Sequence, residues 1–180
     1  MLFTGFVLTS TGPKVLEYNV RFGDPETEAL VLLIQADLAE IMLACTERRL
    51  DAVKLDVKEG KHAVSVVLAS EGYPGSYPKG RKIEFGNVPE GEFGGCPAWM
   101  LCLMTKMCYA WSLRFDPTGV HVFHAGTKKL DDGSIVTDGG RVLAVCAAGD
   151  TLASAVELAY RGVDAIEFEG KTVRRDIAHR

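Results

Sequence analysis

The chain has 180 residues with a formal net charge of −4, and 47% of its residues are hydrophobic and 24% charged. This composition is typical of a globular protein and excludes a mainly disordered, collagen-like or low-complexity chain. The length predicts one domain or two small ones. Because the charge balance is mildly acidic, a large nucleic-acid-binding surface is not expected.

The sequence also argues against membrane and metal–thiolate classes. No apolar run approaches the roughly 20 residues of a spanning helix, and the N-terminus lacks the basic region of a signal peptide. The five cysteines include no CxxC pair, so they predict neither a disulfide framework nor a zinc site; they are Cys45, Cys96, Cys102, Cys108 and Cys146. A reducing, cytoplasmic setting without a membrane partner fits this pattern best.

Two predicted strands open the chain. Residues 2–8 are rich in Phe and Val, residues 11–14 carry a Gly-Pro turn signal, and residues 14–22 again favour a strand. We therefore expect a β-hairpin, which needs a larger sheet because an isolated hairpin is marginally stable in water. A strand that begins at the second residue suggests that the chain is the C-terminal part of a longer protein.

The remainder predicts an α+β fold. Asp24 is placed to cap a helix whose first position is Pro25, and helical periodicity continues to Cys45 with a break near residues 35–37. A polar stretch at residues 54–61 predicts a boundary between domains at 1–57 and 58–180. Downstream we expect strands at residues 62–70, 82–85, 120–124, 142–147 and 165–168, and a helix at 150–161 that Asp150 could cap.

One strand carries an unusual polar row. Side chains alternate between the two faces of a strand, so Glu17, Asn19 and Arg21 share one face. The other face is expected to point into a core; it consists of Leu16, Tyr18, Val20 and Phe22. Carboxylate and amide oxygens suit Mg²⁺, and a guanidinium stabilises a phosphate or oxyanion. The alternative interpretation is the exposed polar face of an edge strand.

These residues lie in a segment, residues 12–26, that resembles a late motif of phosphoribosylamine–glycine ligases. A Glu-x-Asn-x-Arg pattern is shared by the ATP-grasp superfamily, and the following Gly-Asp-Pro-Glu at residues 23–26 is much narrower. Segments further along match the same family in the same order; they are residues 72–80, 124–127, 139–143 and 175–177. The tail is most similar to the fungal bifunctional form, in which an aminoimidazole ribonucleotide synthetase domain follows.

The resemblance implies a fold and a reaction. The chain would contain the end of an ATP-grasp domain, formed by the hairpin and helices, followed by a small α+β C-terminal domain. The family uses ATP to join glycine to 5-phosphoribosylamine through glycyl phosphate, giving glycinamide ribonucleotide in purine biosynthesis. The resemblance places Mg²⁺ or Mn²⁺ on Glu17 and Asn19, and gives Arg21 the catalytic role of stabilising the acyl phosphate.

Other positions keep two interpretations. Asp24 is a helix cap, a substrate contact or both, and Lys79 lies near a substrate phosphate or in a rigid turn between strands. His124 is more often a hydrogen-bonded structural residue than a base. Arg141 follows Gly139-Gly140 and could reach an anion, although this glycine pair is also ordinary turn chemistry.

Residues 93–118 interrupt the family pattern. They could form a helix that docks a partner, a helix packed on its own domain, or the product of a translated intron. Because the N-terminal domain and the ATP lid of the family have no counterpart here, catalysis by these 180 residues alone is not expected. The alternative function is a non-catalytic truncated product or binding module that retains the fold.

Overall fold

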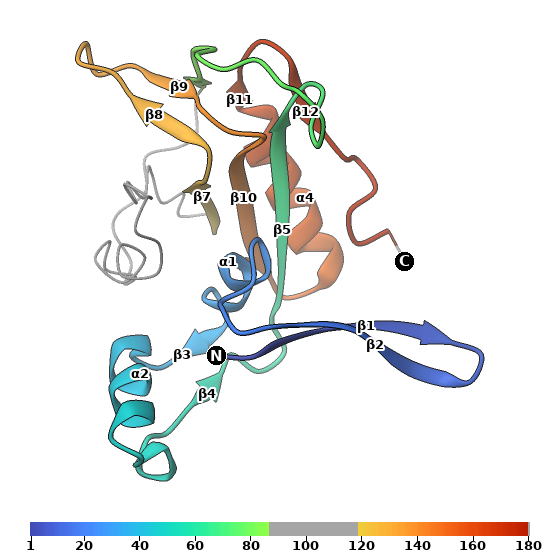
Figure 1. Ribbon diagram of the computed structural model, residues 1–180, viewed down its shortest axis with the longest axis vertical. Coiled ribbons are helices and arrows are strands. Elements are labelled where there is room, and N and C mark those ends of the chain that lie inside the picture. The colour runs from blue at the N-terminus through green and yellow to red at the C-terminus, as the bar shows by residue number, and fades with distance from the viewer. Residues whose placement is uncertain (87–118, 180) are drawn as a thin grey trace.

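The computed structural model describes residues 1–86 and 119–179. The predicted interruption at residues 93–118 therefore lies outside the described part of the chain. Figure 1 shows a central sheet flanked by helices, with a long hairpin that extends away from this body. The mixture of helices and strands confirms the predicted α+β class.

The central sheet has four antiparallel strands in the order β12-β5-β10-β7. Two of them occupy the predicted ranges without change, β5 (His62–Ser70) and β7 (Val120–His124). Strand β10 (Arg141–Gly149), which lies between them, extends beyond the predicted 142–147. Strand β12 (Lys171–Val173) forms one edge of the sheet. Strand β10 is almost entirely buried because it lies in the middle of the sheet.

The two faces of this sheet differ in side-chain size. One face packs large residues such as Val66, Leu68 and Val145 against helix α4 (Leu152–Asp164). The other carries small residues, including Ala144 and Cys146, and receives Leu32 from the segment after helix α1 (Glu26–Leu30). Small side chains let that segment approach the sheet closely, so the N-terminal part of the chain is fixed to the sheet through α1.

Helix α4 begins at a different residue from the one predicted. Its N-cap is Thr151, whose hydroxyl accepts from the Ser154 amide at 3.1 Å, and the Ser154 hydroxyl in turn accepts from the Thr151 amide. This reciprocal pair is a capping box. Asp150, the predicted cap, instead forms an ion pair with Lys61. Both residues are suitable caps by type, and the sequence alone does not distinguish them.

Thr151→Ala is therefore expected to lower the free energy of unfolding by about 1 kcal/mol, because an N-terminal amide of α4 loses its acceptor. Asp150→Ala removes only an exposed ion pair and is expected to have a smaller effect. Urea unfolding of the two variants checks this order. If Asp150→Ala proved the more damaging change, the capping assignment would be wrong.

The hairpin consists of β1 (Phe3–Thr9) and β2 (Gly12–Asn19), which pair antiparallel with an irregularity between Gly5 and Phe6. The predicted hairpin is confirmed, but β2 ends three residues before the predicted Phe22. The expected core face is wrong: Leu16, Tyr18 and Val20 are 67%, 65% and 85% exposed. Alternation separated the two faces of the strand, yet no described element of this chain covers the apolar one.

The predicted break in the following helical segment is confirmed. Helix α1 and helix α2 (Leu38–Thr46) are separated by β3 (Ile34–Gln35), which pairs with β4 (Asp56–Val57). A short 3₁₀ helix, η1 (Leu50–Ala52), precedes β4. The Asp37 carboxylate caps α2 by accepting from the Ala39 amide at 2.8 Å. The domain boundary between residues 57 and 58 stays a prediction.

Short strand pairs complete the C-terminal part. Strand β6 (Glu84–Phe85) pairs with β11 (Ile166–Glu167), and β8 (Thr127–Lys129) pairs with β9 (Ile135–Thr137). The predicted strands at 82–85 and 165–168 are thus present in shortened form. Among the described helices, none has the length and apolar character needed to cross a membrane.

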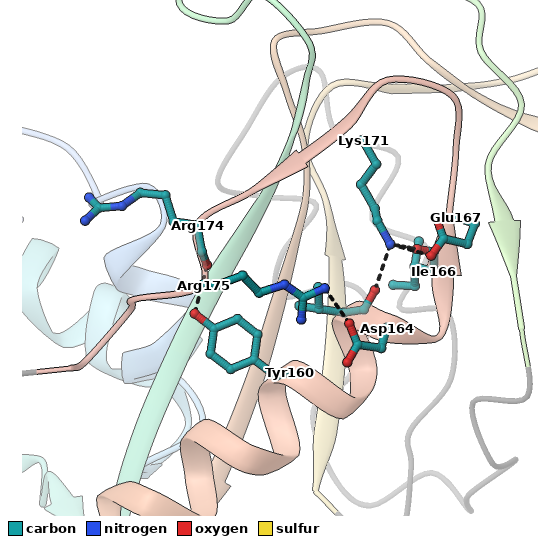
Figure 2. A network of polar contacts seen from close by, with 8 residues as sticks. Tyr160, Asp164, Ile166, Glu167, Lys171, Arg174 and Arg175 are labelled. Atoms are coloured by element: carbon teal, nitrogen blue, oxygen red, sulfur yellow. Dashed lines mark hydrogen bonds and ion pairs between the residues drawn. The ribbon is translucent and has the colours of Figure 1, made fainter.

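The C-terminal tail is attached to α4 through Tyr160 (Figure 2). Its hydroxyl donates to the Arg174 carbonyl at 2.8 Å and accepts from the Ile177 amide at 3.1 Å. The Arg175 guanidinium lies over the Tyr160 ring and donates to Asp164 at 2.6 Å. One aromatic side chain of α4 therefore fixes the course of the tail that follows β12.

Candidate functional site

The polar row predicted on β2 forms a continuous chain of hydrogen bonds. The Asn19 amide nitrogen donates to Glu17 Oε1 at 3.0 Å, and Arg21 Nη2 donates to Asn19 Oδ1 at 3.0 Å. Arg21 Nη1 also donates to the Phe22 carbonyl at 3.0 Å. The structure thus brings the three predicted site residues together on one face, although their chemical roles stay predictions.

The partner strand leaves room beside one end of this row. Glu17 lies opposite Gly5, and Asn19 lies opposite Phe3. A Cβ atom at Gly5 would lie 3.4 Å from Glu17 Cγ, so the missing side chain leaves room beside the carboxylate. Arg21 lies beyond the last residue of β2, in a bend, and the Glu17 side chain is in an exposed segment of the strand.

The donor set fits a hard divalent cation only in part. A carboxylate and an amide oxygen are ligands that Mg²⁺ accepts, and this ion is often held by one or two protein groups plus waters and substrate phosphates. Within residues 1–86 and 119–179, no group of three or more His, Cys, Asp or Glu side chains is arranged to hold a metal. Glu17 and Asn19 could therefore hold the ion only together with ligands from phosphates, water or other protein segments.

Asp24 does not cap a helix, contrary to prediction. The N-cap of α1 is Pro25, and no side chain accepts from the first amides of that helix. Arg141 instead reaches Asp24 with two nitrogens: Nη1 donates to the Asp24 carbonyl at 2.9 Å, and Nη2 lies 3.3 Å from the Asp24 carboxylate. Arg141 does reach an anion, and that anion is a carboxylate of this chain.

Glu28 is an acidic residue in the first turn of helix α1. In the structure its carboxyl is partly buried, and one oxygen has no hydrogen-bond partner among the described residues. Burial raises the pKa of Glu28, the nearby Asp24 and Glu26 carboxylates raise it further, and Arg141 opposes this. Its position three residues after Pro25 gives no local signal of burial, because the burial depends on contacts made by distant strands.

Lys79, predicted to lie near a substrate phosphate, is paired with Asp138, with 3.2 Å between Lys79 Nζ and the Asp138 carboxylate. The loop that carries it packs on the turn before β10, where the Tyr73 and Tyr77 rings approach Gly140 so closely that a Cβ atom there would overlap them. The two rings lie 6.4 Å apart, centre to centre. Substrate contacts of Lys79 and Asp24 stay predictions.

His124 fits its structural interpretation. Its Nδ1 lies 2.9 Å from the Thr127 hydroxyl, its Nε2 is buried without a partner in the described residues, and its ring faces Phe85. Burial lowers the pKa of His124 to about 4. The imidazole is therefore neutral near pH 7, which is unlike a residue placed to deliver a proton at that pH.

Family models and individual relatives both match this chain to one family of proteins. Residues 1–27 match the family model described as "Phosphoribosylglycinamide synthetase, ATP-grasp (A) domain", and residues 112–180 match "Phosphoribosylglycinamide synthetase, C domain". The chain is 44% identical over 179 residues to the bifunctional purine biosynthetic protein ADE1 of Schizosaccharomyces pombe, covering 99% of this chain and 19% of that protein. It is 40% identical over 181 residues to a phosphoribosylamine–glycine ligase of Synechocystis, covering 100% and 37%.

A solved structure supports the same conclusion. The crystal structure of phosphoribosylamine–glycine ligase from Thermotoga maritima matches with a TM-score of 0.64 and 35% identity, covering 98% of this chain and 36% of that one. The fold is thus that of the last part of an ATP-grasp domain followed by a C-terminal domain. The chain belongs to the phosphoribosylamine–glycine ligase family. It spans little more than a third of the single-function relatives and about a fifth of the fungal bifunctional ones.

Proposed function

We propose that this chain supplies the C-terminal part of an ATP-dependent ligase that joins glycine to 5-phosphoribosylamine, giving glycinamide ribonucleotide for purine biosynthesis in the cytoplasm. The observation that carries the proposal is the hydrogen-bonded row of Glu17, Asn19 and Arg21. It lies within the segment that matches the ATP-grasp family model. A carboxylate, an amide oxygen and a guanidinium in series are suited to a metal–phosphate complex.

The reaction follows from the groups that must be joined. A glycine carboxylate oxygen attacks the γ-phosphorus of ATP, ADP leaves, and glycyl phosphate forms. The amine of phosphoribosylamine then attacks the glycyl carbonyl, the amine loses a proton, and inorganic phosphate leaves. Both stages concentrate negative charge on phosphate oxygens, which is where positive groups have their largest effect.

The residues of this chain have distinct parts in that scheme. Glu17 and Asn19 offer oxygens to Mg²⁺ or Mn²⁺, which when bound would neutralise charge on the ATP phosphates. Arg21 supplies donors to the oxygens of the acyl phosphate, and its planar guanidinium suits two parallel hydrogen bonds. The row holds Asn19 between the other two side chains, and Asn19 is hydrogen-bonded to both.

The experiment joins this chain to the N-terminal part of a relative. In the chimera, the chain replaces the matching C-terminal portion of the cyanobacterial ligase, and glycine-dependent ADP release is measured with phosphoribosylamine generated in situ. Turnover by the chimera would support the proposal, and the chain alone is expected to give none. The chimera is needed because the chain covers only 37% of that relative. A folded chimera without turnover would favour the alternative, a non-catalytic product that retains the fold.

In the active chimera, Glu17→Gln is expected to lower kcat more than roughly tenfold, because it removes a full negative charge from the cation site. Asn19→Ala removes a neutral oxygen and is expected to be milder, with partial recovery at raised Mg²⁺. Tyr18→Phe, on the other face of β2, is the matched control and should retain activity. If Glu17→Gln retained activity and Tyr18→Phe lost it, the assignment of the site to the Glu17 face of β2 would be wrong.

The fungal form predicted from the tail stays a prediction. The relative from Schizosaccharomyces pombe is described as a bifunctional purine biosynthetic protein. We propose that an aminoimidazole ribonucleotide synthetase domain accompanies this chain in its full-length context. Sequencing the messenger RNA across this region would test that proposal, and would also show whether residues 93–118 are encoded by an intron.

A further inference from the structure

A contact between two distant parts of the chain lies next to the polar row. Arg141, the first residue of β10, binds both the carbonyl and the carboxylate of Asp24, which is 117 positions away. Asp24 is only three residues beyond Arg21 in the sequence. The contact therefore fastens the segment that carries the guanidinium of the row to the central sheet.

The backbone around Arg141 is held in place by neighbouring segments. The Gly126 amide donates to the Arg141 carbonyl at 2.8 Å, and the backbones of Gly126 and Gly139 approach so closely that neither position has room for a side chain. The Ser70 amide also donates to the Gly140 carbonyl at 2.8 Å. The backbone on both sides of Arg141 is thus fixed by hydrogen bonds and packing.

The segment that it binds has few other supports. Strand β2 ends at Asn19, and the next residue, Val20, is exposed. Within residues 20–25 only Gly23 is buried. The charges of Asp24 and Glu26 raise the pKa of Glu28, and the charge of Arg141 lowers it. Removing that cation would leave the carboxylates to repel one another.

We propose that Arg141 is a positioning residue, which holds residues 20–25 through Asp24 and thereby sets the place of Arg21 beside Asn19. This rests on the proposed function for its catalytic consequence, but not for the ordering of the segment. The contact links the C-terminal domain to the end of the ATP-grasp domain, so the C-terminal domain contributes to the site without touching substrate. Asp24 then acts as the anchor of the segment.

The ordering is tested by hydrogen exchange in the 180-residue chain itself. Arg141→Met should speed amide exchange in peptides covering residues 20–28 by roughly tenfold, because local opening becomes easier. Arg81→Met is the matched control: its side chain is as exposed as that of Arg141, at 39%, and it also pairs with a carboxylate, that of Glu169. Unchanged exchange at residues 20–28 in Arg141→Met would overturn the proposal.

The catalytic consequence is tested in the chimera. Arg141→Met is expected to lower kcat roughly tenfold with little change in the KM for glycine, whereas Arg141→Lys should recover part of the loss. Asp24→Asn retains the backbone carbonyl bond and should be milder, and the double variant should be no worse than Arg141→Met. Two results would make Asp24 a substrate contact and overturn its role as anchor. One is a double variant whose loss of kcat is the product of the two single losses. The other is a KM for glycine that is raised in Asp24→Asn but not in Arg141→Met.

The two failures are distinguishable. An inactive chimera would count against the proposed function, and the exchange experiment on the chain would still decide whether Arg141 orders the segment. An active chimera whose kcat is unaffected by Arg141→Met would overturn the positioning role, whatever the exchange result.

Discussion

Gly126→Ala is expected to lower the free energy of unfolding by about 3 kcal/mol, at the upper end of overpacking effects. A Cβ atom there would lie 2.5 Å from Gly139 Cα and 2.6 Å from the Arg141 carbonyl oxygen. Both obstacles are backbone atoms, so no side-chain rotation can relieve the overlap. The hydrogen bond from the Gly126 amide to Arg141 would lengthen, and the start of β10 would shift.

Urea unfolding of the chain measures this effect, with Gly5→Ala as the matched control. A Cβ atom at Gly5 would make its nearest approach, 3.4 Å, to the flexible Glu17 side chain. The control is therefore expected to change stability little. Similar losses in the two variants would mean that the Gly126–Gly139 approach is looser than described.

The second large effect concerns pH and His124. Burial lowers the pKa of this imidazole in the folded chain to about 4, from the 6.5 of an unperturbed histidine. The unfolded chain therefore binds a proton between these two pH values that the folded chain does not, so stability is lost as the pH falls. A shift of this size corresponds to about 3 kcal/mol once the pH is below both values.

The measurement compares His124→Asn with the original chain. The variant is expected to have a lower free energy of unfolding near pH 7.5, because it loses packing against Phe85. The original chain loses stability as the pH falls and the variant lacks this imidazole, so the difference in free energy of unfolding between them should shrink by about 2 kcal/mol on going to about pH 5. Other groups titrate in both proteins and cancel. A constant difference across this range would mean that His124 is accessible to protons in the folded state.

The strands of the central sheet could be predicted from the sequence because burial leaves a local pattern. Strands β5 and β7 are apolar runs bounded by polar or glycine-rich segments, and their predicted ends were confirmed. The predicted polar row on β2 could be placed on one face for the same reason, since alternation is a local property. The family resemblance was confirmed by the matches to both family models.

The errors at Asp24 and Tyr18 have a common physical origin in contacts between distant residues. Asp24 has the right chemistry for a cap, but Arg141 binds it instead, and no local pattern reports a partner 117 positions away. Tyr18 lies on the apolar face of β2, as a core residue would, but it is exposed. Alternation separates the two faces of a strand and does not show whether another element covers either of them. Thr151 and Asp150 differ too little in capping preference for the sequence to choose between them.

The exposed hairpin has a consequence for the behaviour of the chain in concentrated solution. Strand β1, with the sequence FTGFVLT, contains no charge and no proline, and within the described residues it pairs only with β2. An uncharged strand with a free edge is a template for strands from other molecules. Aggregation is therefore expected to start at β1 while the central sheet stays folded, and a lysine introduced at Val7 should raise the solubility limit.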